Sequence, residues 1–321
     1  MKDFKGKIAV VTGAGTGMGR ELARQLAAEG CDVAICEFIV DNMNETRRLC
    51  EAEALPGTRI LAQECDVSEE DQVIAFRDSV MREFATEHIN LLFNNAGVGG
   101  GSSYVLEDRK IFDKAFAVNW FGVYYNVRAF MPMLLKSSQG HIINTSSVNG
   151  FWACLGPQTP HVSYSAAKFA VKGFTEGLLV DLRLNAPHIK ASVVMPGHVG
   201  TSIGINTRII HGFPDPDEVP DDHLDAMRER MKTRGFPLQN ATNDQLREML
   251  KHQGEQFRDN APVSSAQAAT IILDGVRNGQ WRILIGEDAK RLDMMARNHA
   301  EQLYDQELYS QMLQDFQAEG D

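Results

Sequence analysis

Short apolar runs rich in β-branched residues recur along the chain and alternate with longer segments in which apolar residues return at helical spacing. Near-continuous apolar runs of about four to eight residues are typical of strands that are buried on both faces of a parallel sheet. The pattern predicts seven such strands, at residues 7–12, 32–36, 59–64, 90–94, 140–145, 190–195 and 282–285.

Helical segments at residues 17–29, 69–85, 112–135 and 163–185 separate these runs. Each segment is long enough to be the crossover that joins two parallel strands. The sequence therefore predicts an α/β fold in which a doubly wound, seven-stranded parallel sheet has helices on both faces. Because no Pro/Gly/Ser-rich linker interrupts the alternation before about residue 202, we expect a single domain over residues 1–321.

Two segments depart from this alternation. Between residues 202 and 262, short helical pieces and the sequence GFPDPDEVPDD replace strand signals, with 11 acidic and 8 basic residues. A structureless loop of that length is uncommon in a compact domain, so we expect an inserted substrate lid with helices of its own. Residues 299–321 hold 6 acidic residues and no Lys or Arg, and the i, i+4, i+8 spacing of Tyr304, Leu308 and Met312 predicts one amphipathic helix.

Composition and charge narrow the classes of function. Lys and Arg total 32 against 43 Asp and Glu, a formal charge of -11, so no basic field exists to gather nucleic acid or anionic lipid. No apolar run approaches the ~20 residues that span a bilayer, and the first run ends too early for a signal peptide. Five scattered cysteines without a CxxC pair favour reduced thiols. We expect a cytoplasmic protein without nucleic-acid or membrane partners.

A glycine-rich segment, TGAGTGMG at residues 12–19, lies between the first predicted strand and the first helix. A pyrophosphate at such a junction needs a tight turn, close approach of the backbone and amide N–H groups directed at negative charge. Gly13, Gly17 and Gly19 meet these needs. An ordinary turn can be equally rich in glycine, but this position favours nucleotide binding.

An acidic residue, Glu37, ends the second predicted strand about 20 residues after the glycine turn. A carboxylate there can hold both hydroxyls of an adenosine ribose and would repel a 2′-phosphate. No Lys or Arg lies in the glycine turn before Arg20, and Phe38 rather than a basic residue follows Glu37. The sequence therefore predicts NAD rather than NADP, with a solvated strand-end carboxylate as the alternative interpretation.

Polar and small residues follow the third and fourth predicted strands, as Asp66-Val67 and as NNAG at 94–97. Ligands bind at the carboxyl ends of strands in an open α/β sheet, so Asp66 can meet an adenine amino group and the small residues can let the chain pass a cofactor. As isolated Asx or Gly turns these motifs would mean little.

Tyr164 and Lys168 are spaced i, i+4 near the start of a predicted helix, so the phenol and the ammonium share one face. A free tyrosine, with a pKa of about 10, is a poor acid or base at neutral pH, but a neighbouring ammonium and a positively charged nicotinamide favour the phenolate. Such a pair is commonly an ordinary surface pair. Here Ser146 and Ser147 follow the fifth strand and can bring a hydroxyl to the same edge, which makes Tyr164 a candidate general acid/base.

Together these motifs resemble the short-chain dehydrogenase/reductase family. They comprise, in order, TGAGTGMG, Glu37, DV at 66–67, NNAG at 94–97, Asn119 in AVNWFG, SSVNG at 146–150, YSAAK at 164–168 and PGHVGT at 196–201. Each motif alone is weak evidence for the family, but the ordered set is highly specific. The resemblance covers about residues 4–201 and resumes at the last strand. The resemblance implies a Rossmann-type fold and a homodimer or homotetramer formed through residues 112–135 and 163–185.

The resemblance also implies an active site of four residues. Tyr164 would be the general acid/base, and Lys168 would bind the nicotinamide ribose and lower the Tyr164 pKa. Ser147 would hydrogen-bond the substrate oxygen, and Asn119 would hold a water in the proton relay. Asn95 would lie near the adenosine ribose and Thr201 near the carboxamide. The full set predicted to bind the cofactor is Gly13, Thr16, Gly17, Met18, Gly19, Glu37, Asp66, Val67, Asn95, Ala96, Gly97, Tyr164, Lys168, Pro196, Gly197, Val199 and Thr201.

We therefore expect an NAD-dependent oxidoreductase that transfers a hydride between nicotinamide and a secondary alcohol or ketone of hydrophobic, cyclic or aromatic character. Two alternatives are an NADPH-dependent 3-oxoacyl-type reductase, which Glu37 disfavours, and a catalytically silent NAD-binding regulator, which the intact active-site set disfavours. Phe151, Trp152 and Leu155 lie in an unusually long stretch before Tyr164 and are candidate walls of the substrate pocket or members of the core. The histidines form no HxH or HxxxH cluster, so no metal site is expected.

Overall fold

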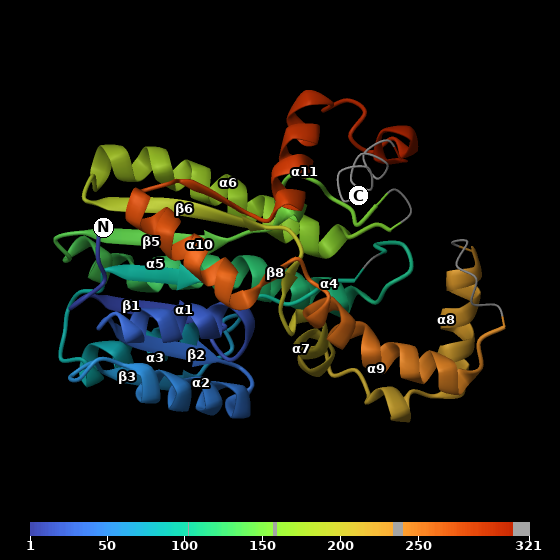
Figure 1. Cartoon of the computed structure of the whole chain (residues 1–321), viewed down its shortest axis with the longest axis horizontal. Coiled ribbons are helices and arrows are strands. Elements are labelled where there is room, and N and C mark those ends of the chain that lie inside the picture. Colours follow the sequence, from blue (N-terminus) through green and yellow to red (C-terminus); the bar gives the residue numbers. More distant parts are fainter. Residues whose placement is uncertain (102, 157–158, 234–239, 311–321) are drawn as a thin grey trace.

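The computed structural model describes residues 1–101, 103–156, 159–233 and 240–310. Its seven long strands are β1 (Ile8–Thr12), β2 (Asp32–Glu37), β3 (Ile60–Glu64), β4 (Leu91–Asn94), β5 (Gly140–Thr145), β6 (Ile189–Pro196) and β9 (Arg282–Ile285). They form one parallel sheet in the order β3-β2-β1-β4-β5-β6-β9 (Figure 1). The predicted doubly wound sheet is confirmed, and its order reverses direction between β1 and β4, where ligands bind in this class of fold.

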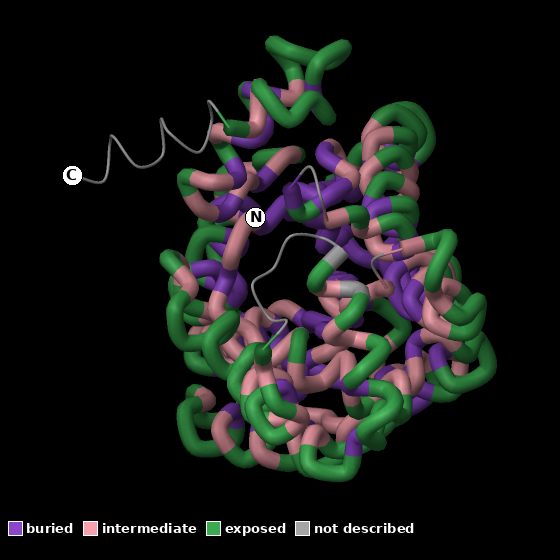
Figure 2. Tube along the Cα trace, turned by 90° about the vertical axis from the view of Figure 1, so that its right-hand side faces the viewer, coloured by how far each residue is buried: buried purple, intermediate pink, exposed green. Residues whose placement is uncertain are grey.

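Two apolar layers cover the faces of the sheet. One is built on α1 (Gly17–Ala28), α2 (Val40–Glu53) and α10 (Ser265–Asn278), and the other on α3 (Glu70–Glu83), α5 (Gly122–Leu135) and α6 (Val162–Asn185). Ala9 and Val11 of β1 pack into the first layer, while Ile8 and Val10 pack into the second. Because successive strand residues face opposite sides, this explains why β1 has apolar residues on both of its faces. Figure 2 shows the buried positions inside the trace and the exposed ones on its outer helices.

The crossover after β4 is helical over residues 109–135, which confirms the predicted helical segment at 112–135, but its middle is not a regular α-helix. It consists of α4 (Arg109–Phe116), a π-helical turn (Ala117–Phe121) and α5. Asn119 lies in the π turn, and its Nδ2 donates to the carbonyl oxygen of Ala115 at 2.8 Å. A side chain that bonds a carbonyl four residues back competes with the backbone ladder, and such wide turns commonly mark functional sites.

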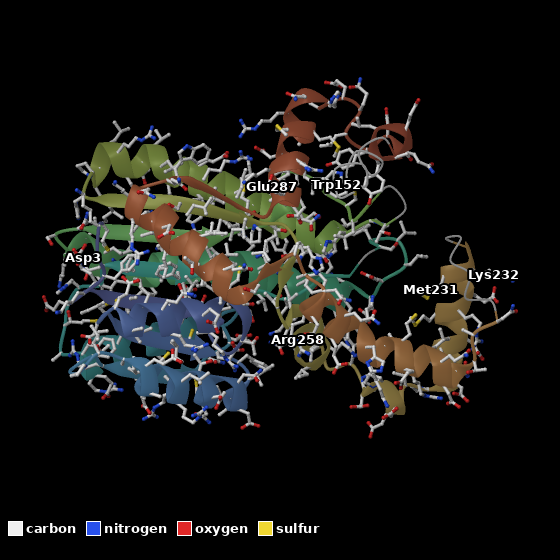
Figure 3. All side chains as sticks on the ribbon, viewed as in Figure 1. Asp3, Trp152, Met231, Lys232, Arg258 and Glu287 are labelled. Atoms are coloured by element: carbon white, nitrogen blue, oxygen red, sulfur yellow. The ribbon has the colours of Figure 1, made fainter. Side chains whose placement is uncertain are left out.

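Helices occupy most of the described part of the insertion between residues 202 and 262. They are α7 (Ile203–Ile210), a 3-10 turn (Pro216–Glu218), α8 (Asp221–Thr233) and α9 (Asn243–Asp259). The ends of the insertion are joined by a short parallel ladder of β7 (Val199–Gly200) and β8 (Val263–Ser264), which is too brief for a sequence pattern to reveal. From its base at Arg258 the insertion extends away from the sheet, with Met231 and Lys232 at its far end (Figures 1 and 3).

The C-terminal part differs from the prediction. After α11 (Glu287–Asn298), residues 301–304 form a turn, and helix begins only at residue 306. A single helix over residues 299–321 is therefore wrong at its start, because Leu303 is buried in an apolar cluster with Trp152 and the chain must turn to place it there. Tyr304 precedes the helix, Leu308 lies in it, and Met312 is outside the described residues.

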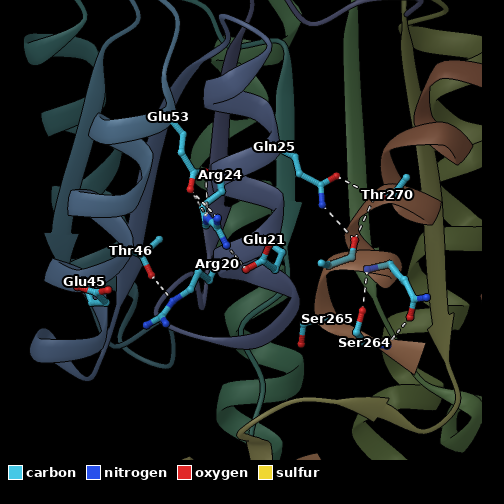
Figure 4. A network of polar contacts seen from close by, with 12 residues as sticks. Arg20, Glu21, Arg24, Gln25, Glu45, Thr46, Glu53, Ser264, Ser265 and Thr270 are labelled. Atoms are coloured by element: carbon cyan, nitrogen blue, oxygen red, sulfur yellow. Dashed lines mark hydrogen bonds and ion pairs between the residues drawn. The ribbon is translucent and has the colours of Figure 1, made fainter. Parts of the chain in front are cut away.

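Polar contacts fix α1, and with it the glycine turn at its start, against α2 and α10. Arg20 Nε donates to Thr46 Oγ1 at 2.9 Å, and Thr46 Oγ1 in turn donates to the carbonyl of Gly15 at 3.0 Å. On the other side, Gln25 Nε2 donates to the carbonyl of Ala266 at 3.0 Å (Figure 4). These bonds hold the glycine turn in place between two helices.

Within the described ranges, no helix is long and apolar enough to cross a membrane. The same part of the chain contains no group of three or more His, Cys, Asp or Glu side chains that could hold a metal ion.

Candidate active site

A cleft runs along the carboxyl ends of the central strands, at the edge where the sequence predicted ligand binding. Every residue predicted to bind the cofactor lines it except Gly19. Of the predicted catalytic set, Ser147, Tyr164 and Lys168 line it and Asn119 does not. The strand order thus brings together motifs that lie up to 188 residues apart, from Gly13 to Thr201.

The glycine turn at the start of α1 has the properties that a pyrophosphate needs. Gly13 has φ +62°, and an added Cβ would lie 2.5 Å from Ala96 Cα. Gly17 has φ +58°, and its Cβ would lie 3.1 Å from Thr201 Cγ2. The N-cap residue Thr16 makes no side-chain bond to the helix. The first-turn N–H groups of α1 therefore lack a side-chain cap, which suits an anionic ligand at this end of the helix.

Gly19 and Asn95 support this turn from behind. An added Cβ on Gly19 would lie 2.2 Å from the Gly13 carbonyl oxygen, so the lack of a side chain lets α1 pack against the turn. Asn95 Nδ2 donates to the carbonyl oxygens of Thr12 (3.3 Å) and Gly13 (3.1 Å). Thr12 Oγ1 accepts from the N–H groups of Asn95 and Ala96, both at 3.1 Å. The sequence did not predict that Asn95 and Thr12 clamp the glycine turn to the end of β4.

Backbone N–H groups hold the Glu37 carboxylate. Its Oε2 accepts from Gly15 N–H at 2.9 Å, and its Oε1 accepts from the N–H groups of Phe38 (3.0 Å) and Ile39 (3.2 Å). The sequence analysis did not identify Gly15 as a site residue. An added Cβ at Gly15 would lie 2.6 Å from Glu37 Cγ. The site therefore presents a fixed negative charge to the cleft at the end of β2.

Asp66 forms hydrogen bonds within the protein that the sequence did not predict. Its Oδ1 accepts from the N–H (2.9 Å) and the hydroxyl (2.6 Å) of Ser68, and its Oδ2 accepts from Lys114 Nζ at 2.6 Å. Burial acts to raise the Asp66 pKa, but the bonds from Lys114 and Ser68 lower it below its usual value. Asp66 is thus a charged residue whose contact with adenine would be additional to these bonds.

Ser147, Tyr164 and Lys168 meet at one place in the cleft, although they come from the end of β5 and from α6. Ser147 and Tyr164 both line the cleft, and the Ser147 hydroxyl lies near enough to the phenol to favour its phenolate form. Lys168 Nζ lies 5.3 Å from the centroid of the Tyr164 ring and donates to the carbonyl of Thr145 at 3.0 Å. Ser147 Oγ also accepts from Asn149 N–H at 3.1 Å. A hydroxyl, a phenol and an amine therefore converge on one point of the cleft.

Burial controls the protonation of these groups in the protein itself. It raises the pKa of Tyr164 to about 12, against the opposing effect of the nearby Ser147 hydroxyl. It also lowers the pKa of Lys168 to about 7. The expected lowering of the Tyr164 pKa by Lys168 is therefore absent in the protein alone, because the ammonium itself is disfavoured by desolvation. At neutral pH the Tyr164 phenol is protonated.

Asn119 lies behind Gly97 rather than on the wall of the cleft. Its Nδ2 donates to the carbonyl oxygens of Val98 and Ala115, both at 2.8 Å. Its Oδ1 is buried without a hydrogen-bond partner among the described residues. An added Cβ on Gly97 would lie 2.9 Å from this oxygen and 3.4 Å from Lys168 Nζ. A free acceptor and the amine of Lys168 therefore face the same glycine.

Comparison with known proteins decides the family. The family model for short chain dehydrogenases matches residues 7–209. The chain belongs to the short-chain dehydrogenase/reductase (SDR) family. It is 31% identical over 297 residues, 92% of each chain, to SadH of Mycobacterium tuberculosis, which is provisionally described as an oxidoreductase. The chain studied is therefore an NAD(P)-dependent oxidoreductase.

Solved structures agree with this family. A Burkholderia phymatum SDR in complex with NAD aligns with a TM-score of 0.74 and 27% identity, over 94% of this chain and 96% of that one. A metagenomic SDR in complex with NADP aligns with a TM-score of 0.52 and 31% identity, over 60% of this chain and 83% of that one. Similar SDR proteins thus bind either dinucleotide.

The insertion of this SDR covers part of the cleft. Ile203, Asn206 and Ile210 of α7 line the cleft together with Phe257 of α9. Asn206 Nδ2 donates to Thr16 Oγ1 at 3.0 Å, so α7 reaches the glycine turn. No local pattern identified these residues, because their approach depends on how the insertion folds back.

Asp288 supports the PGHVGT motif of the SDR, and the sequence analysis did not identify it. Its Oδ2 accepts from His198 N–H at 2.6 Å, and an added Cβ on Gly197 would lie 2.1 Å from the same oxygen. His198 does not line the cleft; its Nε2 lies 2.7 Å from the Phe257 carbonyl oxygen. Asp288 at the start of α11 therefore helps to shape the loop that follows β6.

Of the two interpretations of Phe151, Trp152 and Leu155, the structure does not support the one that makes them walls of the substrate pocket of this SDR. Phe151, Trp152 and Leu155 do not line the cleft; Trp152 is buried in an apolar cluster with the C-terminal segment, and Leu155 is exposed. His161, by contrast, stacks on Tyr164 with ring centroids 4.7 Å apart, and burial lowers its pKa to about 4. His161 is thus a neutral ring against the face of the phenol, and its position three residues before Tyr164 was the only available signal.

Proposed function

We propose that this protein is an NAD-dependent dehydrogenase/reductase that acts on a hydrophobic secondary alcohol or the corresponding ketone. The observation that supports this most is the convergence of Ser147, Tyr164 and Lys168 within the cofactor cleft. Tyr164 lines the cleft together with Ser147 and has an amine 5.3 Å from its ring, so it provides a proton donor and acceptor beside a place for a substrate oxygen.

Each residue of the site has a separate role in the proposed reaction. When bound, oxidised nicotinamide accepts the hydride and brings a positive charge that lowers the pKa of a nearby phenol. Ser147 holds the alcohol oxygen, and the Tyr164 phenolate takes the hydroxyl proton as the carbinol carbon loses its hydride. In reduction, the protonated Tyr164 gives its proton to the carbonyl oxygen, a role for which its pKa of about 12 keeps it ready at neutral pH. Lys168 binds the ribose, and Asn119 Oδ1 accepts from a relay water beside it.

Glu37 supports NAD as the cofactor. Its carboxylate is fixed at the cleft by three N–H groups, where it would bind two ribose hydroxyls and repel a 2′-phosphate. Gly15 provides one of these N–H groups, so the glycine turn and the ribose site are joined. The similar Burkholderia phymatum structure, which contains NAD, agrees with this choice.

Apolar side chains of the insertion support a hydrophobic substrate. Ile203 and Ile210 of α7 and Phe257 of α9 line the cleft, so an apolar molecule would bury surface there at a gain of about 25 cal/mol per Å². We propose that α7 and the adjoining insertion act as the substrate lid. Water exclusion under such a lid strengthens the polar interactions of Ser147 and Tyr164.

We also propose that the protein forms a homodimer or homotetramer through α4–α5 and α6. Phe121, Phe169, Val180 and Leu184 are exposed apolar residues on these elements. Exposed apolar surface of this kind is typical of protein–protein interfaces.

The proposed function is tested by cofactor reduction with a panel of aliphatic, cyclic, aromatic and steroidal secondary alcohols, with NAD and NADP in parallel. Tyr164→Phe should lower kcat by about 10²- to 10⁴-fold, because general acid/base catalysis contributes that much, and should leave NADH affinity nearly unchanged. Tyr104→Phe serves as a control for the general effect of removing a phenol oxygen, because Tyr104 is exposed and does not line the cleft. Retention of most activity in Tyr164→Phe would exclude Tyr164 as the acid/base, and tight NADH binding without turnover of any alcohol would contradict the proposal.

A further inference from the structure

The loop that follows Ser147 is tied to it by one residue. We call residues 148–156 the catalytic loop. Asn149 N–H donates to Ser147 Oγ at 3.1 Å, and Asn149 Nδ2 donates to the carbonyl oxygens of Trp152 (2.8 Å) and Cys154 (2.9 Å). Asn149 is buried, so these bonds have little competition from water. A shift of the backbone at residues 152–154 is therefore passed to the hydroxyl of Ser147.

The outer side of this loop rests on a segment from the far end of the chain, residues 303–309, which we call the C-terminal clasp. Tyr309 stacks on Trp152 with ring centroids 5.7 Å apart and planes at 23°. Ala153 N–H donates to Tyr304 Oη at 3.2 Å. Gly156 has φ +111°, and an added Cβ would lie 3.1 Å from Tyr309 Oη. Three separate contacts thus join the two segments.

An apolar cluster fixes the clasp to the body of the protein. Leu303 of the clasp and Trp152 of the loop are buried together with Leu292 and Met295 of α11. Figure 3 shows Trp152 beside α11. None of the described residues of the clasp lines the cofactor cleft. The clasp therefore touches the loop that carries Ser147 without touching the dinucleotide site.

We infer that the C-terminal clasp positions Ser147 through the catalytic loop and so determines how well the enzyme holds its alcohol or ketone. Tyr309 and Tyr304 are positioning residues, since they act through Trp152, Ala153 and Asn149. The inference rests on the proposed function, in which Ser147 holds the substrate oxygen. It requires that loosening the clasp weakens substrate binding and leaves cofactor binding intact.

The test compares Tyr309→Ala with Tyr309→Phe in the full chain. Loss of the aromatic stack should raise the hydrogen-exchange rate of residues 148–156 and the KM for the alcohol, each by about three- to tenfold, with the KM for NAD unchanged. Tyr309→Phe keeps the stack and should behave as the unmodified protein. Met294→Ala, which removes an exposed side chain on α11 outside the cluster, is the matched control.

Tyr304→Phe provides an independent variant that keeps the ring and removes the acceptor of Ala153 N–H. It should also raise exchange in the catalytic loop. Unchanged exchange at residues 148–156 in both Tyr309→Ala and Tyr304→Phe would show that the clasp does not hold the loop. Faster exchange with an unchanged KM for the alcohol would overturn the positioning of Ser147. If the unmodified protein turns over no alcohol or ketone, the proposed function fails, and the exchange rates alone decide whether the clasp exists.

Discussion

Replacement of Glu37 by Ala tests how the protein selects its dinucleotide. The carboxylate is held by the N–H groups of Gly15, Phe38 and Ile39, so its charge cannot move away from an approaching phosphate. At a separation of about 5 Å and an effective dielectric constant of about 20, the repulsion is about 3 kcal/mol for each unit of phosphate charge. Salt screening reduces this value, so we expect the NAD-to-NADP ratio of kcat/KM to fall by about 30- to 100-fold in Glu37→Ala.

The assay measures kcat/KM for both dinucleotides with one alcohol, and the free energy of unfolding in urea. Loss of the acceptor leaves three N–H groups beside the cleft, which water can reach, so a cost of about 1–3 kcal/mol in stability is expected. Asp41→Ala is the matched control, because Asp41 is exposed near the start of α2 and does not line the cleft. It removes the same charge and should leave the ratio unchanged.

A ratio that stays within about twofold of the unmodified protein in Glu37→Ala would refute the reasoning, provided the variant is folded and turns over. A similar fall in Asp41→Ala would show that net charge, rather than the ribose site, makes the selection. The change of the NAD-to-NADP ratio in the two variants therefore distinguishes the effect of the Glu37 carboxylate from the effect of the protein's net charge.

Two further predictions concern groups outside the catalytic set. Asp288→Ala should weaken NADH binding by about tenfold in calorimetry, because the loop after β6 loses the acceptor of His198 N–H. Asp288→Asn retains an acceptor and should bind NADH nearly normally. Equal NADH affinities for the two variants and the unmodified protein would contradict this prediction. Burial lowers the pKa of His141 to about 3, so between that pH and about 6.5 the unfolded chain binds a proton that the folded protein does not. Stability should therefore fall by about 2 kcal/mol from pH 7 to pH 5, and His141→Gln should lose this part of the pH dependence in urea unfolding; identical pH profiles would contradict the assignment.

Local signals were sufficient for the fold and for most of the residues that line the cleft. The strands at the centre of the sheet, such as β1 (IAVVT), contain apolar runs because they are buried between two layers of helices, whereas the edge strand β3 (ILAQE) is only partly buried and contains Gln63 and Glu64. The i, i+4 spacing of Tyr164 and Lys168 and the position of Glu37 at the end of β2 are likewise readable along the chain. Parallel strands then bring their carboxyl ends to one edge, so the approximate site follows from the predicted fold.

The tertiary structure alone decided the partners and the charge states of these residues. Glu37 meets Gly15 across 22 positions, Asp288 meets His198 across 90, and Tyr304 meets Ala153 across 151. Periodicity and turn propensity extend over a few residues, so they contain no information on such pairs. The protonation of Tyr164 also depends on packing, although its spacing to Lys168 suggested a lowered pKa. Burial raises the pKa of Tyr164 to about 12 and lowers the pKa of Lys168 to about 7, because desolvation disfavours the charged form of each group.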